Sequence, residues 1–324
     1  MYARQLDGFE QERPEPAAET PAFQAETVAV YPGDKNNLPY DVVVQTLRTN
    51  EPEPPTPAVE PEKTLDEVLD EHPVSIQVNG EWQTFPNVKA AEEASYEEYK
   101  ANLRRTAENF RITDDHLGEG GPKAKFQANV EAIKLLKYLE ETTEQATPEQ
   151  QKILSRYVGW GGLADAFDPD KESWSKEYAQ LKELLTPEEY AAARGSTLNA
   201  HYTSPTVIKA IYEAVGRMGF ETGNILEPSC GVGNFFGMLP EEMRNSRLYG
   251  VELDSISGRI AQQLYPKANI TVAGFETTDR RDFYDLAIGN VPFGQYQVND
   301  KAYNKLGFNI HNYFFAKALD QVRP

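Results

Sequence analysis

Four short apolar segments alternate with helical segments between residues 199 and 324. The apolar segments are typical of strands: NILE at Asn224–Glu227, then RLYGVELD, NITVAG and DFYDLAIGN. Stretches with helical periodicity, such as TSPTVIKAIYEAV and SGRIAQQLY, occupy the intervals. Parallel strands need a crossover connection, usually a helix, whereas antiparallel neighbours need only a short turn. The alternation therefore predicts an α/β fold with a parallel, doubly wound sheet, and no other feature constrains the fold as strongly.

The first of these strands runs into a glycine turn, ILEPSCGVGNFF. Gly231 and Gly233 allow a tight turn and a close approach of backbone to a ligand. A dinucleotide-binding turn needs a third glycine where this chain has Phe236, so pyrophosphate binding is disfavoured. Glu252 ends the next strand, where a carboxylate can accept both hydroxyls of a ribose. The pattern suits an adenosine ligand without pyrophosphate, such as S-adenosylmethionine; a glycine turn that serves packing alone is the alternative.

The fourth strand ends in NVPF, residues Asn290, Val291, Pro292 and Phe293. The side-chain oxygen of Asn290 and the backbone carbonyl of Val291 are two acceptors for the N–H groups of one exocyclic amine. Acceptors fixed in this way favour the pyramidal nitrogen of a methyl-transfer transition state. Phe293 can stack on a base swung out of a duplex, worth roughly 1 to 3 kcal/mol. The alternative is a proline turn with Phe293 in the core.

Two further residues have a structural and a functional interpretation. Cys230 lies inside the glycine turn, and no basic residue lies near it in sequence to lower its pKa, so we expect a small core residue and not a nucleophile. Trp160 is surrounded by glycines in RYVGWGGLADAFD. We expect a turn that buries the indole, in preference to direct contact of the indole with a ligand or nucleic acid.

The chain before residue 199 divides into three parts. Residues 1–72 are rich in proline and glutamate and poor in large apolar side chains, which predicts a mostly disordered acidic leader. Residues 73–109 contain SIQVNGEWQTF, a hairpin pattern around an Asn-Gly turn, followed by a helical stretch. Residues 110–198 are predicted to be a helical region, with apolar residues at helical spacing and two capping boxes, Thr147 to Gln150 and Thr186 to Glu189.

Composition limits the classes of protein that fit. The formal net charge is −19, and no basic stripe offers itself to phosphates, so we do not expect tight DNA binding by this chain alone. A single cysteine excludes an intramolecular disulfide, and the four histidines form no metal-ligand cluster in sequence. No apolar run reaches the ~20 residues needed to cross a bilayer. We expect a soluble, cytoplasmic protein with no membrane partner; the oligomeric state stays open.

HYTSP, LEPSCGVGNF, YGVELD and NVPFG occur in that order. This order resembles the Rossmann-like, S-adenosylmethionine-dependent DNA adenine-N6 methyltransferases and is similar to modification subunits of type I restriction systems. The resemblance implies S-adenosylmethionine as cofactor and catalysis by Asn290, Val291, Pro292 and Phe293. It assigns cofactor binding to Tyr202, Thr203, Glu227, Pro228, Gly231, Gly233, Asn234 and Glu252. By chemistry alone, Tyr202 and Thr203 are equally well helix-capping residues.

More of the chain resembles one group of mobile-element proteins. The run from FRITDDHLGEGGPKAKF to HNYFFAKALDQVRP, residues 110–324, is similar to the N-terminal methylase region of very large methylase and helicase proteins. These are carried by conjugative elements, plasmids and phages, and some protect incoming DNA from restriction. The resemblance implies four strands in the order 3-2-1-4 over residues 199–324, the first part of a methyltransferase domain. It also implies DNA as a partner bound through parts beyond Pro324, without which the fragment is inactive.

The chain departs from that pattern at several positions. Val291 stands where the family usually has proline. The family also commonly has an Asp after the third strand that contacts the adenine of the cofactor, and only Glu276 or Asp279 could take its place here. His311 and Asn312 occupy a motif position that faces the cofactor pocket, or form a satisfied polar pair on a core helix. Two other functions stay open. One is a methyltransferase for a protein glutamine or an RNA guanine amine, and the other is a catalytically degenerate cofactor-binding or assembly module.

Overall fold

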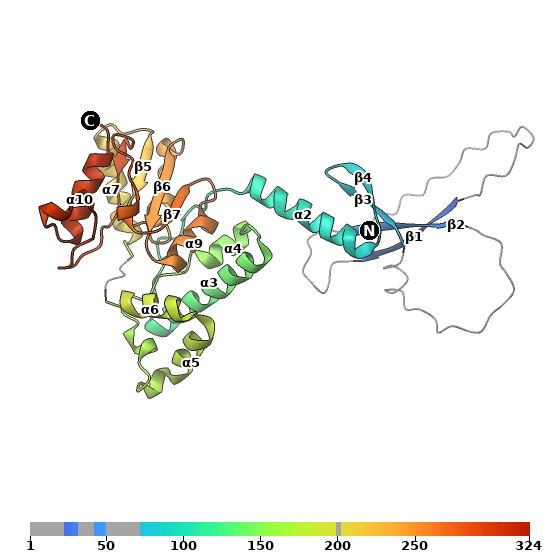
Figure 1. Cartoon of the computed structure of the whole chain (residues 1–324), viewed down its shortest axis with the longest axis horizontal. Coiled ribbons are helices and arrows are strands. Elements are labelled where there is room, and N and C mark those ends of the chain that lie inside the picture. Colours follow the sequence, from blue (N-terminus) through green and yellow to red (C-terminus); the bar gives the residue numbers. More distant parts are fainter. Residues whose placement is uncertain (1–22, 32–41, 50–71, 199–201) are drawn as a thin grey trace, which may run out of the picture. The chain divides into compact units, whose positions relative to one another are not determined.

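The computed structural model of the chain describes residues 23–31, 42–49, 72–198 and 202–324 (Figure 1). The chain divides into two compact units, Met1–Tyr99 and Lys100–Pro324. Each unit is described by itself below. No helix in the described ranges is both long enough and apolar enough to cross a membrane.

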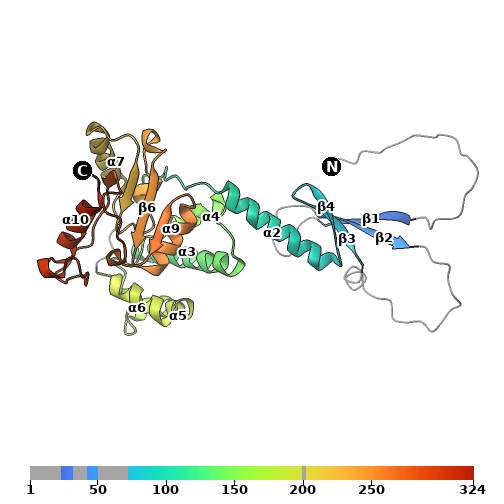
Figure 2. The ribbon, with the colours of Figure 1, turned by 45° about the horizontal axis from the view of Figure 1, so that its top comes forward.

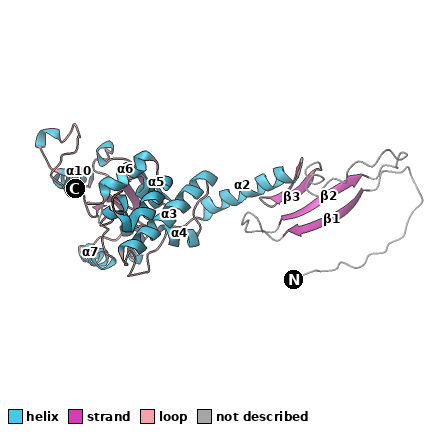
Figure 3. Ribbon diagram, turned by 90° about the horizontal axis from the view of Figure 1, so that it is seen from below, coloured by secondary structure: helices cyan, strands magenta, loops and turns pink. Residues whose placement is uncertain are grey.

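The first unit contains a four-stranded antiparallel sheet in the order β1-β2-β3-β4 (Figure 3). Its strands are β1 (Phe23–Tyr31), β2 (Val42–Thr49), β3 (Val74–Val78) and β4 (Glu81–Phe85). The predicted hairpin joins β3 to β4 through Asn79 and Gly80, whose φ angles of 52° and 79° are those of a tight hairpin turn. Helix α2 (Val88–Thr106) follows, and its first turns pack on β3.

Strands β1 and β2 lie inside the range that the sequence predicts to be mostly disordered. Both segments, FQAETVAVY and VVVQTLRT, contain β-branched residues, which favour extended backbone. Strand β2 pairs with β3, and β1 pairs with β2. The sheet edge on which the two strands build therefore belongs to the β3–β4 hairpin, which lies outside the predicted leader. The prediction missed these two strands because it rested on the average composition of residues 1–72, in which proline and glutamate outweigh the two short β-branched segments. The other residues of the predicted leader, apart from His72, lie outside the described ranges.

In the helical part of the second unit, helices begin at the capping residues that the sequence predicts. The helices are α3 (Pro122–Thr142), α4 (Pro148–Leu154), α5 (Ser175–Leu184) and α6 (Pro187–Ser196), with short 3-10 turns η1 (Ala164–Phe167) and η2 (Glu172–Trp174). Both predicted capping boxes are present, at Thr147 and Thr186, with proline at the start of each helix. The apolar face of α3 is buried, as its periodicity predicts.

The sheet of the second unit has four parallel strands in the order β7-β6-β5-β8. They are β5 (Asn224–Glu227), β6 (Arg247–Glu252), β7 (Asn269–Val272) and β8 (Leu286–Ala287). The helices of this part are α7 (Pro205–Arg217) before β5, α8 (Asn234–Gly237) and α9 (Ser255–Leu264) between strands, and α10 (Ile310–Gln321) after β8, with η3 (Glu241–Met243), η4 (Phe275–Thr277) and η5 (Asn304–Leu306). The architecture is α/β with a parallel sheet, as predicted, and is compatible with a Rossmann-like fold.

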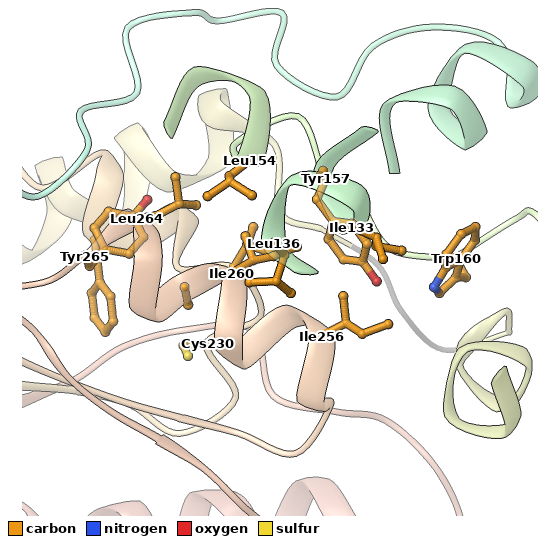
Figure 4. Close-up of a cluster of buried hydrophobic side chains, with 14 of the residues drawn as sticks. Ile133, Leu136, Leu154, Tyr157, Trp160, Cys230, Ile256, Ile260, Leu264 and Tyr265 are labelled. Carbon is orange, nitrogen blue, oxygen red and sulfur yellow. The ribbon is translucent and has the colours of Figure 1, made fainter. Parts of the chain in front are cut away.

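One hydrophobic core connects the helical region to this sheet. Figure 2 shows α9 beside α3 and α4, and Ile133, Leu136 and Leu154 share a cluster with apolar residues of α9 (Figure 4). Gln151 adds polar contacts, because its amide donates to the carbonyl oxygens of Gln263 and Leu264. A second cluster packs Leu226 and Val251 against aromatic residues of α10. The helical region is therefore attached to the sheet mainly through α9.

Candidate functional site

A cavity of about 280 Å³ lies where β5, β6 and β8 end. Crevices at the carboxyl ends of parallel strands are where open α/β sheets bind ligands. All predicted cofactor and catalytic residues except Pro228 and Gly233 line this cavity: Tyr202, Thr203, Glu227, Gly231, Asn234, Glu252, Asn290, Val291, Pro292 and Phe293. Sequence segments far apart in the chain thus meet at one place.

Glu252 holds the glycine turn against the end of β6. Its carboxylate accepts hydrogen bonds from the backbone N–H groups of Gly231 and Asp254, both at 2.7 Å. Burial raises the pKa of Glu252 to about 7, although these backbone hydrogen bonds act in the opposite direction. Each carboxylate oxygen has a second lone pair, so Glu252 keeps acceptor capacity for hydroxyl groups in the cavity.

The two glycines of the turn have different roles. Both have left-handed backbone, with φ angles of 56° at Gly231 and 82° at Gly233. A Cβ atom on Gly231 would lie 3.4 Å from the Tyr202 ring at the cavity wall, whereas one on Gly233 would lie 2.5 Å from Cε2 of Tyr265. Gly233 does not line the cavity. This position serves the turn and the packing of Tyr265, and contact of Gly233 with a cofactor stays a prediction.

Glu227 presents an unsatisfied oxygen in this cavity. The residue is 3 % exposed, and its Oε2 atom has no hydrogen-bond partner. Burial, and secondarily the neighbouring Glu252, raise the pKa of Glu227 well above its usual range. A buried polar atom without a partner carries a desolvation cost that a ligand donor can remove. A cationic or N–H donor group of a ligand is the chemistry that this carboxyl group fits.

The NVPF loop is tied to the glycine turn. The Ser229 hydroxyl donates a hydrogen bond of 3.0 Å to the backbone carbonyl oxygen of Asn290. Phe293 is 65 % exposed and its ring lies 6.2 Å from that of His311, so the alternative with Phe293 in the core is wrong. The Nδ1 atom of His311 is buried and has no partner. His311 is therefore a neighbour of Phe293 that does not line the cavity itself.

Three other predicted candidates lie outside the cavity. Glu276 and Asp279 do not line it, and neither does Asn312, whose backbone N–H is capped by the Asn309 side chain at the start of α10. Among the described residues, no group of three or more His, Cys, Asp or Glu side chains is arranged to hold a metal ion.

Trp160 and Cys230 have the structural roles expected of them. Trp160 is 1 % exposed and packs edge-on against Phe126, Tyr157 and Phe167. Cys230 is buried, and burial raises the pKa of its thiol well above the usual range, which disfavours the nucleophilic thiolate.

The structure also adds residues that sequence reasoning missed. Tyr157, Gly159 and Ser196 come from the helical region, and Asp254 and Ser257 come from the start of α9; all line the cavity. The one sequence signal for the first group was the density of glycines around Trp160, which correctly indicated a turn. That signal could not reveal that the turn faces the sheet, because the facing residues lie far away in sequence.

Comparison with known proteins gives two relatives. No family model matches the chain, and no solved structure matches it. Defense against restriction protein B of Escherichia phage P1 is 28 % identical over 213 residues, which cover 64 % of this chain and 8 % of that protein. Type II methyltransferase M.CvrRI of Paramecium bursaria Chlorella virus XZ-6E is 38 % identical over 92 residues, 28 % of this chain and 24 % of that protein. The chain spans a quarter or less of the length of these relatives.

Proposed function

We propose that this chain carries the cofactor pocket and the amine site of an S-adenosylmethionine-dependent DNA adenine-N6 methyltransferase. The observation that carries the proposal is one cavity lined by Glu227, Glu252 and the NVPF loop, with Ser229 joined to Asn290. The similarity to a viral methyltransferase and to a phage protein named for defence against restriction supports a methylase-like function.

The residues at the cofactor end fit the proposed ligand. Glu252 lies at the end of β6 with acceptor capacity for ribose hydroxyls, and the unpaired oxygen of Glu227 fits an ammonium group. Because a cation nearby favours the ionised form of a carboxyl group, its arrival would lower the raised pKa of Glu227. The cofactor would supply an electrophilic methyl group on sulfonium. No covalent bond to the protein is needed.

The NVPF loop would hold the accepting amine. Asn290 and the carbonyl group of Val291 offer acceptors to the two N–H bonds, which draws the nitrogen lone pair out of conjugation with the ring. Phe293, whose ring neighbours that of His311, would support the base by stacking. The amine nitrogen would then be placed to accept the methyl group that the cofactor would supply, with the thioether product as leaving group and the surplus proton passing to water. Val291 keeps the carbonyl group, without the fixed φ of proline.

The biological setting is part of the proposal. The phage relative suggests a protein of a mobile element that protects DNA from restriction. DNA contacts would come mainly from parts of a longer protein, since the net charge of −19 opposes binding to phosphates. Helicase motifs in that longer protein would agree with this assignment.

Calorimetry tests the cofactor pocket. Titration of the chain with S-adenosylmethionine should give binding heat that is lost or strongly reduced in Glu252→Ala. Equal affinities in the two proteins would contradict the assignment of Glu252.

Methyl transfer tests the chemistry. The full-length protein that contains this chain, given labelled S-adenosylmethionine, should transfer the methyl group to adenine N6 of unmethylated DNA at low salt. The Asn290→Ala variant of that protein should show no transfer. Labelling of a protein glutamine or of RNA guanine instead would support the alternative methyltransferases. Cofactor binding without transfer to any of these substrates would support the degenerate module.

A further inference from the structure

The segment of residues 157–159 in the helical region is held by one buried side chain of α3. Asn129 is 0 % exposed. Its Nδ2 atom donates to the carbonyl oxygen of Gly159 at 2.6 Å, and its Oδ1 atom accepts from the backbone N–H of Val158 at 2.9 Å. Both ends of the amide are therefore used to fix the backbone of this segment, and the neighbouring Trp160 anchors the segment in the core.

The fixed segment lies against Tyr202. Gly159 has a φ angle of 67°, and a Cβ atom there would lie 2.9 Å from Cε2 of Tyr202. The Cε1 atom of the same ring is the nearest atom to a Cβ built on Gly231, at 3.4 Å. The Tyr202 hydroxyl is 3.5 Å from Oγ of Ser257 on α9. The ring thus lies between a glycine of the helical region and a glycine of the β5 turn.

The same segment forms part of the cavity surface. Tyr157 and Gly159 line the cavity together with Glu227 and Glu252, and Tyr157 is fully buried in the core that joins α3 and α9. Burial raises the pKa of the Tyr157 hydroxyl well above its usual range, so it stays a neutral donor. The sheet loops alone therefore leave one side of the cavity to residues from before the Rossmann-like part.

We infer that Tyr157 and Gly159 form a ligand-binding wall of the nucleoside pocket, and that Asn129 is the positioning residue that sets the affinity of the pocket by holding this wall against Tyr202. The identity of the ligand rests on the proposed function. The wall itself rests on the geometry of Asn129, Gly159 and Tyr202. The helical region is thus part of the binding site as well as a support for the sheet.

A matched pair of glycine variants tests the wall. Gly159→Ala and Gly162→Ala both place a side chain on left-handed backbone, with φ angles of 67° and 73°, but a Cβ atom on Gly162 would meet no heavy atom within 4 Å. Because the two φ angles are similar, both variants carry comparable backbone strain. Gly159→Ala should weaken the binding of S-adenosylmethionine by about tenfold or more relative to Gly162→Ala, measured by calorimetry on the whole chain.

A second pair tests the positioning role of Asn129. Val130 is its neighbour on α3 and is also 0 % exposed. Its side chain has no polar atom, so it cannot hydrogen-bond to the backbone of residues 157–159. Asn129→Ala and Val130→Ala should both lower the melting temperature. Below the melting range, only Asn129→Ala should raise the dissociation constant, again by about tenfold. An equal change in both variants would mean that Asn129 is only structural.

The outcomes separate the inference from the proposed function. If the wild-type chain binds S-adenosylmethionine and the Gly159→Ala and Gly162→Ala variants bind it with equal affinity, the inferred ligand-binding wall is wrong. Absence of binding by the folded wild-type chain overturns the proposed cofactor, and the role of the wall with it. If Asn129→Ala does not fold, the glycine pair alone decides the question.

Discussion

The hydroxyl of Ser229 lies 3.0 Å from the backbone carbonyl oxygen of Asn290 and donates a hydrogen bond to it. The first residue follows β5 and the second follows β8, which are neighbours in the sheet. Together with the pairing of β5 and β8, this hydrogen bond holds the turn proposed for the cofactor close to the loop proposed for the amine. Methyl transfer in line requires such a fixed separation, because small displacements of reacting groups cost large factors in rate.

Removal of the Ser229 hydroxyl should therefore slow transfer more than it weakens binding. Ser229→Ala removes one hydrogen bond, worth about 0.5 to 1.5 kcal/mol, so kcat should fall by roughly threefold to tenfold. The affinity for S-adenosylmethionine should stay close to that of the wild type. Ser229→Thr keeps the hydroxyl and serves as the control. An equal loss of kcat in both variants would show that the hydrogen bond is unimportant.

The raised pKa of Glu252 gives a pH dependence of stability. Its ordinary value of 4.5 is raised to about 7 in the folded chain, chiefly by burial. The unfolded chain releases this proton first, so the contribution of Glu252 to stability is fully present below pH 4.5 and is lost as pH rises toward 7.

Glu252→Gln removes that titration. Thermal unfolding of both proteins from pH 4.5 to 8 should show the variant gaining stability relative to the wild type up to pH about 7, with a constant difference above it. A difference in melting temperature that does not change with pH would contradict the raised pKa.

A buried ion pair anchors the segment that follows the NVPF loop. Lys317 on α10 lies 2.8 Å from Asp300, which also accepts a hydrogen bond from the Tyr313 hydroxyl. Burial alone would raise the pKa of Asp300, but the contacts with Lys317, Tyr313 and the backbone of Ala302 outweigh it and lower that pKa.

Asp300→Asn leaves Lys317 buried without its counter-charge, and should cost roughly 3 to 5 kcal/mol in the free energy of unfolding. The double variant Asp300→Asn with Lys317→Met should recover much of that loss. Because the pKa of Asp300 is lowered, the wild type should lose this stabilisation as pH falls below the ordinary range of an aspartate, whereas the double variant should not. Urea unfolding at several pH values measures both effects.

Phe293 offers a specific test of base stacking. Phe293→Ala should weaken the productive binding of DNA by roughly 1 to 3 kcal/mol, seen as a lower kcat/KM, while the affinity for cofactor changes little. Phe315 on α10 is similarly exposed but does not line the cavity, so Phe315→Ala is the matched control. Equal kinetics for the two variants would exclude stacking on Phe293.

Much of the fold follows from signals that are local in sequence. The strand at Asn224–Glu227, the capping boxes at Thr147 and Thr186 and the hairpin at Asn79 are all present where the sequence predicts them. Each depends on residues only a few positions apart, so side-chain chemistry and backbone preference suffice to predict it. The parallel sheet follows in the same way from the alternation of strands and helices.

The site is predicted only in part, because contacts between distant residues complete it. Parallel strands bring their carboxyl ends to one edge, and this places Glu227, Glu252 and Asn290 together without further information. Gly233 and Gly231 look alike in sequence, but the packing of Tyr265 and Tyr202 separates their roles.

By itself, the sequence determined the type and order of most elements and the edge of the sheet at which the cavity lies, since these depend on local periodicity and on the geometry of parallel strands. Only the tertiary structure decided that Gly159, held by Asn129, lines the cavity and that β2 pairs with the hairpin strand β3 while β1 pairs with β2. The physical reason is that packing and strand pairing depend on which surfaces meet across long sequence separations, and no local pattern encodes that choice.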